Sequence, residues 1–188
     1  MADWLAVRRE SKEALPQMLV QAIIIAGVLC ICELVSAPIY VRMSGNAFNI
    51  LPWFLVADLF AVAFTYTVGF ILLWAVESLT DRLDIPKILP FIYALAGLIG
   101  FAAWGYAVFP AVINAIILPA HGITLTGAAK LGIGVNCAAA GFVSFFFGAI
   151  LPSRLASRRT TVIVIGVVTV AFAVLGGIIY GLTISALS

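Results

Sequence analysis

Five long apolar stretches, separated by short polar segments, follow one another along the chain. They cover about residues 15–40, 51–76, 88–118, 127–151 and 161–184. A helix needs about 20 apolar residues to cross the hydrocarbon layer of a bilayer, so each stretch is long enough for one crossing. The segments between them leave no room for a soluble domain. The pattern therefore predicts an all-α integral membrane bundle of five transmembrane helices, forming one membrane-embedded domain over residues 1–188.

The third stretch is longer than one crossing requires, and Pro110 lies inside it. Proline removes a backbone hydrogen bond and kinks or breaks a helix. We interpret residues 91–109 as the crossing, with residues 110–118 bending away near the far surface. A single tilted helix is the alternative that the sequence leaves open.

The composition agrees with a lipid environment. Hydrophobic residues make up 64% of the chain and charged residues 10%, whereas soluble domains carry roughly 25% charged residues. The net charge of +2 is too small to suggest nucleic acid, so the expected partner is the lipid bilayer. The three cysteines fall in apolar runs and are interpreted as small buried hydrophobic residues. No cofactor and no metal is expected.

The basic residues divide unevenly between the two sides that five crossings create. One side holds eight of the ten: Arg8, Arg9, Lys12, Arg82, Lys87, Arg154, Arg158 and Arg159. The other side has Arg42, with Lys130 inside a span. Because Lys and Arg concentrate in cytoplasmic segments, we expect the N-terminus in the cytoplasm and the C-terminus outside. The expected location is a bacterial plasma membrane.

The N-terminal segment, residues 2–14, mixes apolar and basic side chains. It is interpreted either as a short amphipathic helix on the inner membrane surface or as a disordered tail. Residues 35–37 resemble a signal-peptide cleavage site. The length of the apolar run, Glu33 before the site and Pro38 after it argue against cleavage, so the first span is expected to be retained.

Three ionisable residues fall inside the predicted spans: Glu33, Asp58 and Lys130. A charge at the centre of a membrane helix costs at least about 2.5–3.5 kcal/mol on insertion scales, so such residues face protein or water and suggest function. Each lies nine residues from a polar segment on the outer side, a count that starts at His121 for Lys130. At 1.5 Å per residue, all three are about 13 Å or less below that boundary.

Helical spacing places each of the three on a face of small residues, where membrane helices approach one another closely. In the fourth stretch this face is a seven-residue repeat of glycines: Gly127, Gly134, Gly141 and Gly148. A further pair, Gly177 and Gly181, forms a G-x-x-x-G in the fifth stretch. The glycines are expected to serve helix packing.

These faces predict a buried polar cluster of Glu33, Asp58 and Lys130 in the outer leaflet, with Asn136 and Tyr66 as further candidates. With two carboxylates and one ammonium, one acid is expected to keep its proton. One interpretation is a salt bridge that only fixes helix register. The other is a site for substrate or proton transport.

Enzymatic interpretations find little support. The single histidine, His121, excludes histidine dyads and multi-histidine metal sites, and neither H-E-x-x-H nor G-x-S-x-G occurs. We therefore expect no catalytic residues. The leading hypothesis is a small accessory or structural subunit of a larger membrane complex, associated with other subunits or with itself. The alternative is a small transporter or channel that uses the cluster for proton or substrate coupling.

Overall fold

The computed structural model describes residues 16–46, 49–80, 87–155 and 158–187. Its helices are α2 (Gln17–Met43), α3 (Ile50–Phe64), η1 (Thr65–Gly69), α4 (Phe70–Thr80), α5 (Leu89–His121), α6 (Gly127–Ile150), α7 (Pro152–Leu155) and α8 (Arg159–Leu187). Together they form five helical runs that are long and apolar enough to cross a membrane. The predicted bundle of five spans is confirmed. The predicted N-terminal amphipathic segment, residues 2–14, lies outside the described residues.

The second span is one continuous run of α3, η1 and α4, and η1 is a five-residue π-helix. Two threonine hydroxyls bond back to the preceding turn: Thr65 Oγ1 donates to the Ala61 carbonyl at 2.9 Å, and Thr67 Oγ1 donates to the Ala63 carbonyl at 2.6 Å. Such back-bonding competes with the regular helix ladder. Short π segments inside α-helices occur frequently at functional sites.

The third span does not bend away at Pro110. Helix α5 continues for 33 residues through both Pro110 and Pro119, so the expected break is wrong and the single-helix alternative holds. Pro110 is buried, and a membrane bundle tolerates proline inside a helix because neighbouring groups can satisfy the freed carbonyl. Gly122 ends the helix in a left-handed conformation (φ 67°), and its N–H donates to the Leu118 carbonyl.

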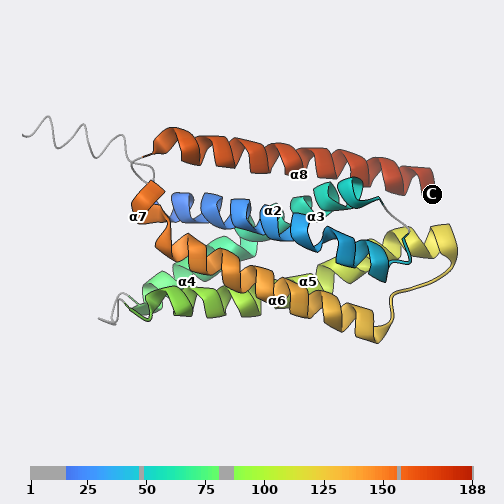
Figure 1. The fold of residues 1–188 in the computed structure, drawn as a ribbon, viewed down its shortest axis with the longest axis horizontal. Helices are drawn as coiled ribbons and strands as arrows, with labels where there is room; N and C mark the ends of the chain where they lie inside the picture. Colours follow the sequence, from blue (N-terminus) through green and yellow to red (C-terminus); the bar gives the residue numbers. More distant parts are fainter. Residues whose placement is uncertain (1–15, 47–48, 81–86, 156–157, 188) are drawn as a thin grey trace, which may run out of the picture.

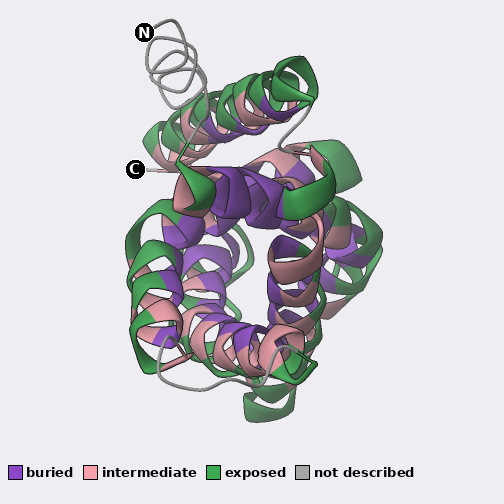
Figure 2. Ribbon diagram, turned by 90° about the vertical axis from the view of Figure 1, so that its left-hand side faces the viewer, coloured by how far each residue is buried: buried purple, intermediate pink, exposed green. Residues whose placement is uncertain are grey.

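The helices run along the long axis of the molecule and form an inner group with one outer helix (Figure 1). Helices α2, α3, α5 and α6 share the main buried cluster, and buried residues face inward from each of them (Figure 2). Helix α8 lies outside this group and packs mainly against α3 and α2. Of an apolar stretch of 18 residues in α8, only 22% is buried, compared with 39–50% of such a stretch in each of the other spans.

Helices α5 and α6 form the most extensive contact of the bundle. At its centre Gly97 and Gly141 face each other, and a methyl group added to either would collide with the backbone carbonyl of the other. The closeness of two helix backbones therefore depends on two residues that lack side chains. Gly105 makes a similar close contact with Cys137.

The four glycines of the seven-residue repeat do not share one environment. Gly134 lies at ordinary van der Waals distance from Tyr106, and a methyl group on Gly148 would lie 2.5 Å from Ile25 of α2. Gly127, at the start of α6, has open space around it. Of the repeat, Gly141 makes the closest approach to the backbone of another helix.

Helices α3 and α8 also meet at a glycine. A methyl group on Gly176 would overlap the backbone of Leu55. A methyl group added to Gly177 would lie 3.9 Å from the Leu59 side chain, and one added to Gly181 would meet open space. The close contact is therefore made by the residue next to the G-x-x-x-G motif rather than by the motif as a pair.

Candidate functional site: a buried pair of carboxyl groups

Glu33 of α2 and Asp58 of α3 lie in the interface between their two helices, and both are fully buried at 0% exposure. Their small neighbours explain the burial: Ala26 and Cys30 precede Glu33 on its helix face, and Ala61 follows Asp58 on its own. The two carboxyl groups are close enough to interact electrostatically. Two acidic side chains thus lie buried near each other in the membrane-spanning part of the chain.

Neither acid has a hydrogen-bond partner in the part of the chain that the structure describes. All four carboxyl oxygens of Glu33 and Asp58 are buried without one among the described residues. The thiol of Cys30 is the polar group beside Asp58, and the hydroxyl of Tyr40 is the one near Glu33, but neither reaches hydrogen-bonding geometry. Buried polar groups are normally paired, so four unpaired oxygens at one place require an explanation.

Aromatic rings cover the pair on the side of the C-terminal end of α2. Tyr40 stacks on Phe109 at a centroid distance of 5.8 Å and packs against Trp53 at 5.6 Å. All three rings are buried. Tyr40 follows Glu33 by seven residues, or about 10 Å of helix.

A second aromatic group covers the opposite side. The Phe64 ring lies 4.9 Å from the ring of Phe101 and 6.3 Å from that of Phe145, and all three are buried. Phe64 follows Asp58 by six residues, or about 9 Å of helix, and η1 begins at the next residue. Buried aromatic rings therefore lie beyond the acid pair along the bundle in both directions, and Phe64 adjoins the irregular turn.

A polar network joins α2 to α6 close to Glu33. Ser36 Oγ donates to Asn136 Oδ1 at 3.1 Å, and Asn136 Nδ2 donates to the Tyr40 hydroxyl at 2.8 Å. The same hydroxyl lies 3.5 Å from Cys137 Sγ. Asn136 thus lies near the acids through Tyr40. Tyr66, the other further candidate for the predicted cluster, is 37% exposed. It lines a separate hollow with residues of α8.

Lys130 does not join the two acids. It lies in the first turn of α6 and is partly exposed, and no basic side chain among the described residues reaches the four carboxyl oxygens. The bond between Ser36 and Asn136 aligns Glu33 with a level of α6 that is about 13 Å from Lys130. The expected three-residue cluster is thus a pair, and the expected salt bridge is not formed.

The surroundings of the pair indicate what it can bind. No group of three or more His, Cys, Asp and Glu side chains that could hold a metal ion occurs in the described part of the chain. Two carboxyl groups without other ligands can bind and release protons, and Cys30, Tyr40 and Cys137 are the neighbouring groups with exchangeable protons. Sequence spacing could have identified Cys30, since it precedes Glu33 by three residues on the same face.

Comparison with known proteins adds nothing to this description. No protein-family model, curated protein or solved structure matches the chain.

Proposed function

We propose that this protein carries protons through the membrane on the carboxyl pair of Glu33 and Asp58, as a small transporter. The observation that carries the proposal is the complete burial of both acids without a hydrogen-bond partner within the described ranges. An ionisable group inside a membrane span is by default a functional site. A salt bridge that fixes helix register would need a basic partner, and Lys130 lies too far along α6 to supply one.

The enclosed arrangement fits the closed state of such a carrier. Burying an isolated carboxylate in an apolar environment is so costly that the group takes up a proton instead. The neutral form of the pair therefore suits the closed state, and opening toward water would allow release. Phe64 and the adjoining η1 are suited to form one gate, because a π segment leaves the helix ladder adjustable.

Proton flux into liposomes tests this function. Purified protein is reconstituted with a trapped pH-sensitive dye, and a potassium gradient with valinomycin drives proton entry. We expect Asp58→Asn and Glu33→Gln each to slow protein-dependent flux by about 100-fold or more, the contribution typical of a positioned proton-transfer group. The amide keeps the shape of each side chain and cannot take up or release a proton at neutral pH.

Glu77→Gln is the matched control, because Glu77 lies near the end of α4 and is only partly buried. It is expected to leave flux unchanged. Folding of each variant is checked by its elution as a single species in detergent. Equal flux through the wild type, Asp58→Asn and Glu33→Gln proteins would contradict the proposal.

A second function, as a subunit of a larger membrane complex, is supported by α8. Most of this helix faces outward, including Val167, Leu175 and Leu182, which are 47–66% exposed. An outer helix with so little internal contact offers a surface to another membrane protein or to a second copy of the chain.

Extraction of native membranes in a mild detergent tests the subunit hypothesis. We expect a stoichiometric partner to migrate with the protein on a native gel and to be identified by mass spectrometry. Substituting Trp for Val167 is expected to release that partner, because the larger ring would disturb helix packing at the exposed face. A protein that always migrates alone excludes the subunit role and leaves the transporter.

We further propose that the N-terminus faces the cytoplasm, the C-terminus faces outward, and the membrane is a bacterial plasma membrane. Lys87, Arg158 and Arg159 lie at the end of the bundle where α2 begins, whereas Arg42 and Lys130 lie at the other end. The basic excess supports this orientation. We also propose that the function is not enzymatic.

A further inference from the structure

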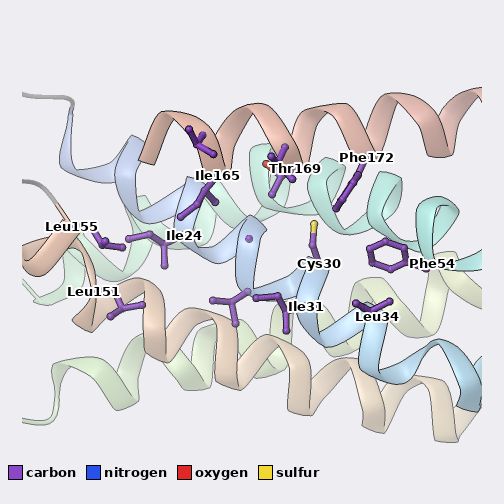
Figure 3. Close-up of a pocket in the computed structure, with 14 residues that line it drawn as sticks. Ile24, Cys30, Ile31, Leu34, Phe54, Leu151, Leu155, Ile165, Thr169 and Phe172 are labelled. Carbon is purple, nitrogen blue, oxygen red and sulfur yellow. The ribbon is translucent and has the colours of Figure 1, made fainter. Parts of the chain in front are cut away.

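A long apolar cleft lies on the outside of the bundle between α2 and α8 (Figure 3). Ile24, Val28 and Ile31 line it from α2, and Val164, Val168 and Phe172 line it from α8. Apart from the Cys30 thiol and the Thr169 hydroxyl, its side chains are hydrocarbon. The Thr169 hydroxyl already donates to the Gly166 carbonyl at 3.0 Å. The cleft is therefore suited to a hydrocarbon ligand.

The size of the cleft fits a single hydrocarbon chain. It extends along α2 from Ile24 to Leu34, about 15 Å of helix, which is half the roughly 30 Å hydrocarbon thickness of a bilayer. Its cavity volume is about 350 Å³. The length of the cleft suits one acyl chain of one leaflet.

Basic residues lie in sequence beside the residues that line one end of the cleft. Leu151 and Leu155 line that end, and the exposed Arg154 lies between them in sequence. Exposed Arg158 and Arg159 follow at the start of α8. Arginine clusters at a membrane surface attract anionic lipid head groups. The other end, near Leu34, lies at mid-membrane depth, where an acyl chain would terminate.

We propose that the α2–α8 cleft binds one anionic phospholipid, with an acyl chain along α2 and the phosphate at the Arg154, Arg158 and Arg159 cluster. The chain would run past Cys30, which lines the cleft and neighbours Asp58. The bound lipid would therefore lie against Cys30, the residue between the cleft and Asp58. This site is independent of proton transport, since it would exist equally in a protein that carries nothing.

Native mass spectrometry of the full chain in detergent tests the site, with phosphatidylglycerol and phosphatidylcholine as the probes. We expect one phosphatidylglycerol to remain bound. Val168→Trp places a ring in the cleft and is expected to weaken that binding about tenfold or more. Val174→Trp is the matched control, because Val174 is 56% exposed on the same helix and does not line the cleft.

The head-group contact is tested separately. Replacing Arg154, Arg158 and Arg159 together by Gln is expected to abolish the preference for phosphatidylglycerol over phosphatidylcholine, whereas Arg42→Gln at the opposite end preserves it. Unchanged binding in Val168→Trp would overturn the proposal. So would a preference unaltered by the triple substitution, or a copurifying protein that crosslinks to position 168 in place of lipid. Proton flux is measured on the same variants, so loss of lipid is distinguished from loss of transport.

Discussion

An Asp58→Leu variant is expected to be more stable than the wild-type protein, by about 1–3 kcal/mol. The carboxyl group of Asp58 is fully buried without a hydrogen-bond partner, so its removal from water is uncompensated. The two methyl groups of leucine take the places of the two oxygens without such a cost. The measurement is the free energy of unfolding in mixed micelles of a mild detergent and dodecyl sulfate.

Asp58→Asn is the matched control for this prediction. It keeps the shape and leaves an unpaired polar group in the same place, so no gain in stability is expected. Combined with loss of proton flux in both variants, the result would show a side chain retained at a cost to stability, as is common at functional sites. If Asp58→Leu were less stable than Asp58→Asn, the carboxyl group would be making a stabilising interaction that its surroundings do not indicate.

The second large effect is expected at the contact between α5 and α6. Gly141→Ala should destabilise the bundle by about 1–3 kcal/mol, the usual cost of overpacking. The added methyl group would meet the Gly97 carbonyl and the Phe101 Cβ, at 2.7 Å from the latter. A backbone carbonyl cannot rotate aside as a flexible side chain can, so the two helices must separate. The measurement is again the free energy of unfolding.

Gly134→Ala, one heptad earlier on α6, provides the control. Its methyl group would lie 3.5 Å from Tyr106, an ordinary contact. Alanine is a better helix former than glycine by about 1 kcal/mol at most, so this variant is expected to be neutral or slightly more stable. The two substitutions are thus expected to change stability in opposite directions. This separates the effect of close contact between the helices from the effect of helix propensity. Equal effects at the two positions would show that the backbone contact does not limit stability.

The spans were predictable from sequence because the apolar runs are long and the polar breaks between them are clear. The continuation of α5 through Pro110 was not, since it depends on what the neighbouring helices do for the freed carbonyl. The π segment of the second span was equally hidden. Threonine pairs such as Thr65 and Thr67 are common in regular membrane helices and do not by themselves indicate one.

Of the candidate site, the inward direction of Glu33 and Asp58 followed from the small residues on their helix faces. The position of Lys130 did not follow. Its depth was counted from His121, but α6 begins only at Gly127, so the lysine lies in the first turn. Depth in a span depends on where its helix begins, and a polar loop of several residues leaves that uncertain. The close contact between Gly176 and the backbone of Leu55 was equally unpredictable, because it depends on where α3 and α8 cross.

The outer position of α8 has a consequence for the biogenesis of the protein. A chain emerges from the ribosome N-terminus first, and folded units form in that order. Helices α2 to α6 can therefore assemble before α8 is inserted, with Cys30 and Val62 still uncovered on the flank where Ala173 later packs. Docking of α8 is then the step that covers Cys30, the neighbour of Asp58, on this flank. A nascent chain without α8 would present an unfinished membrane face, a feature that quality-control proteases of the membrane could recognise.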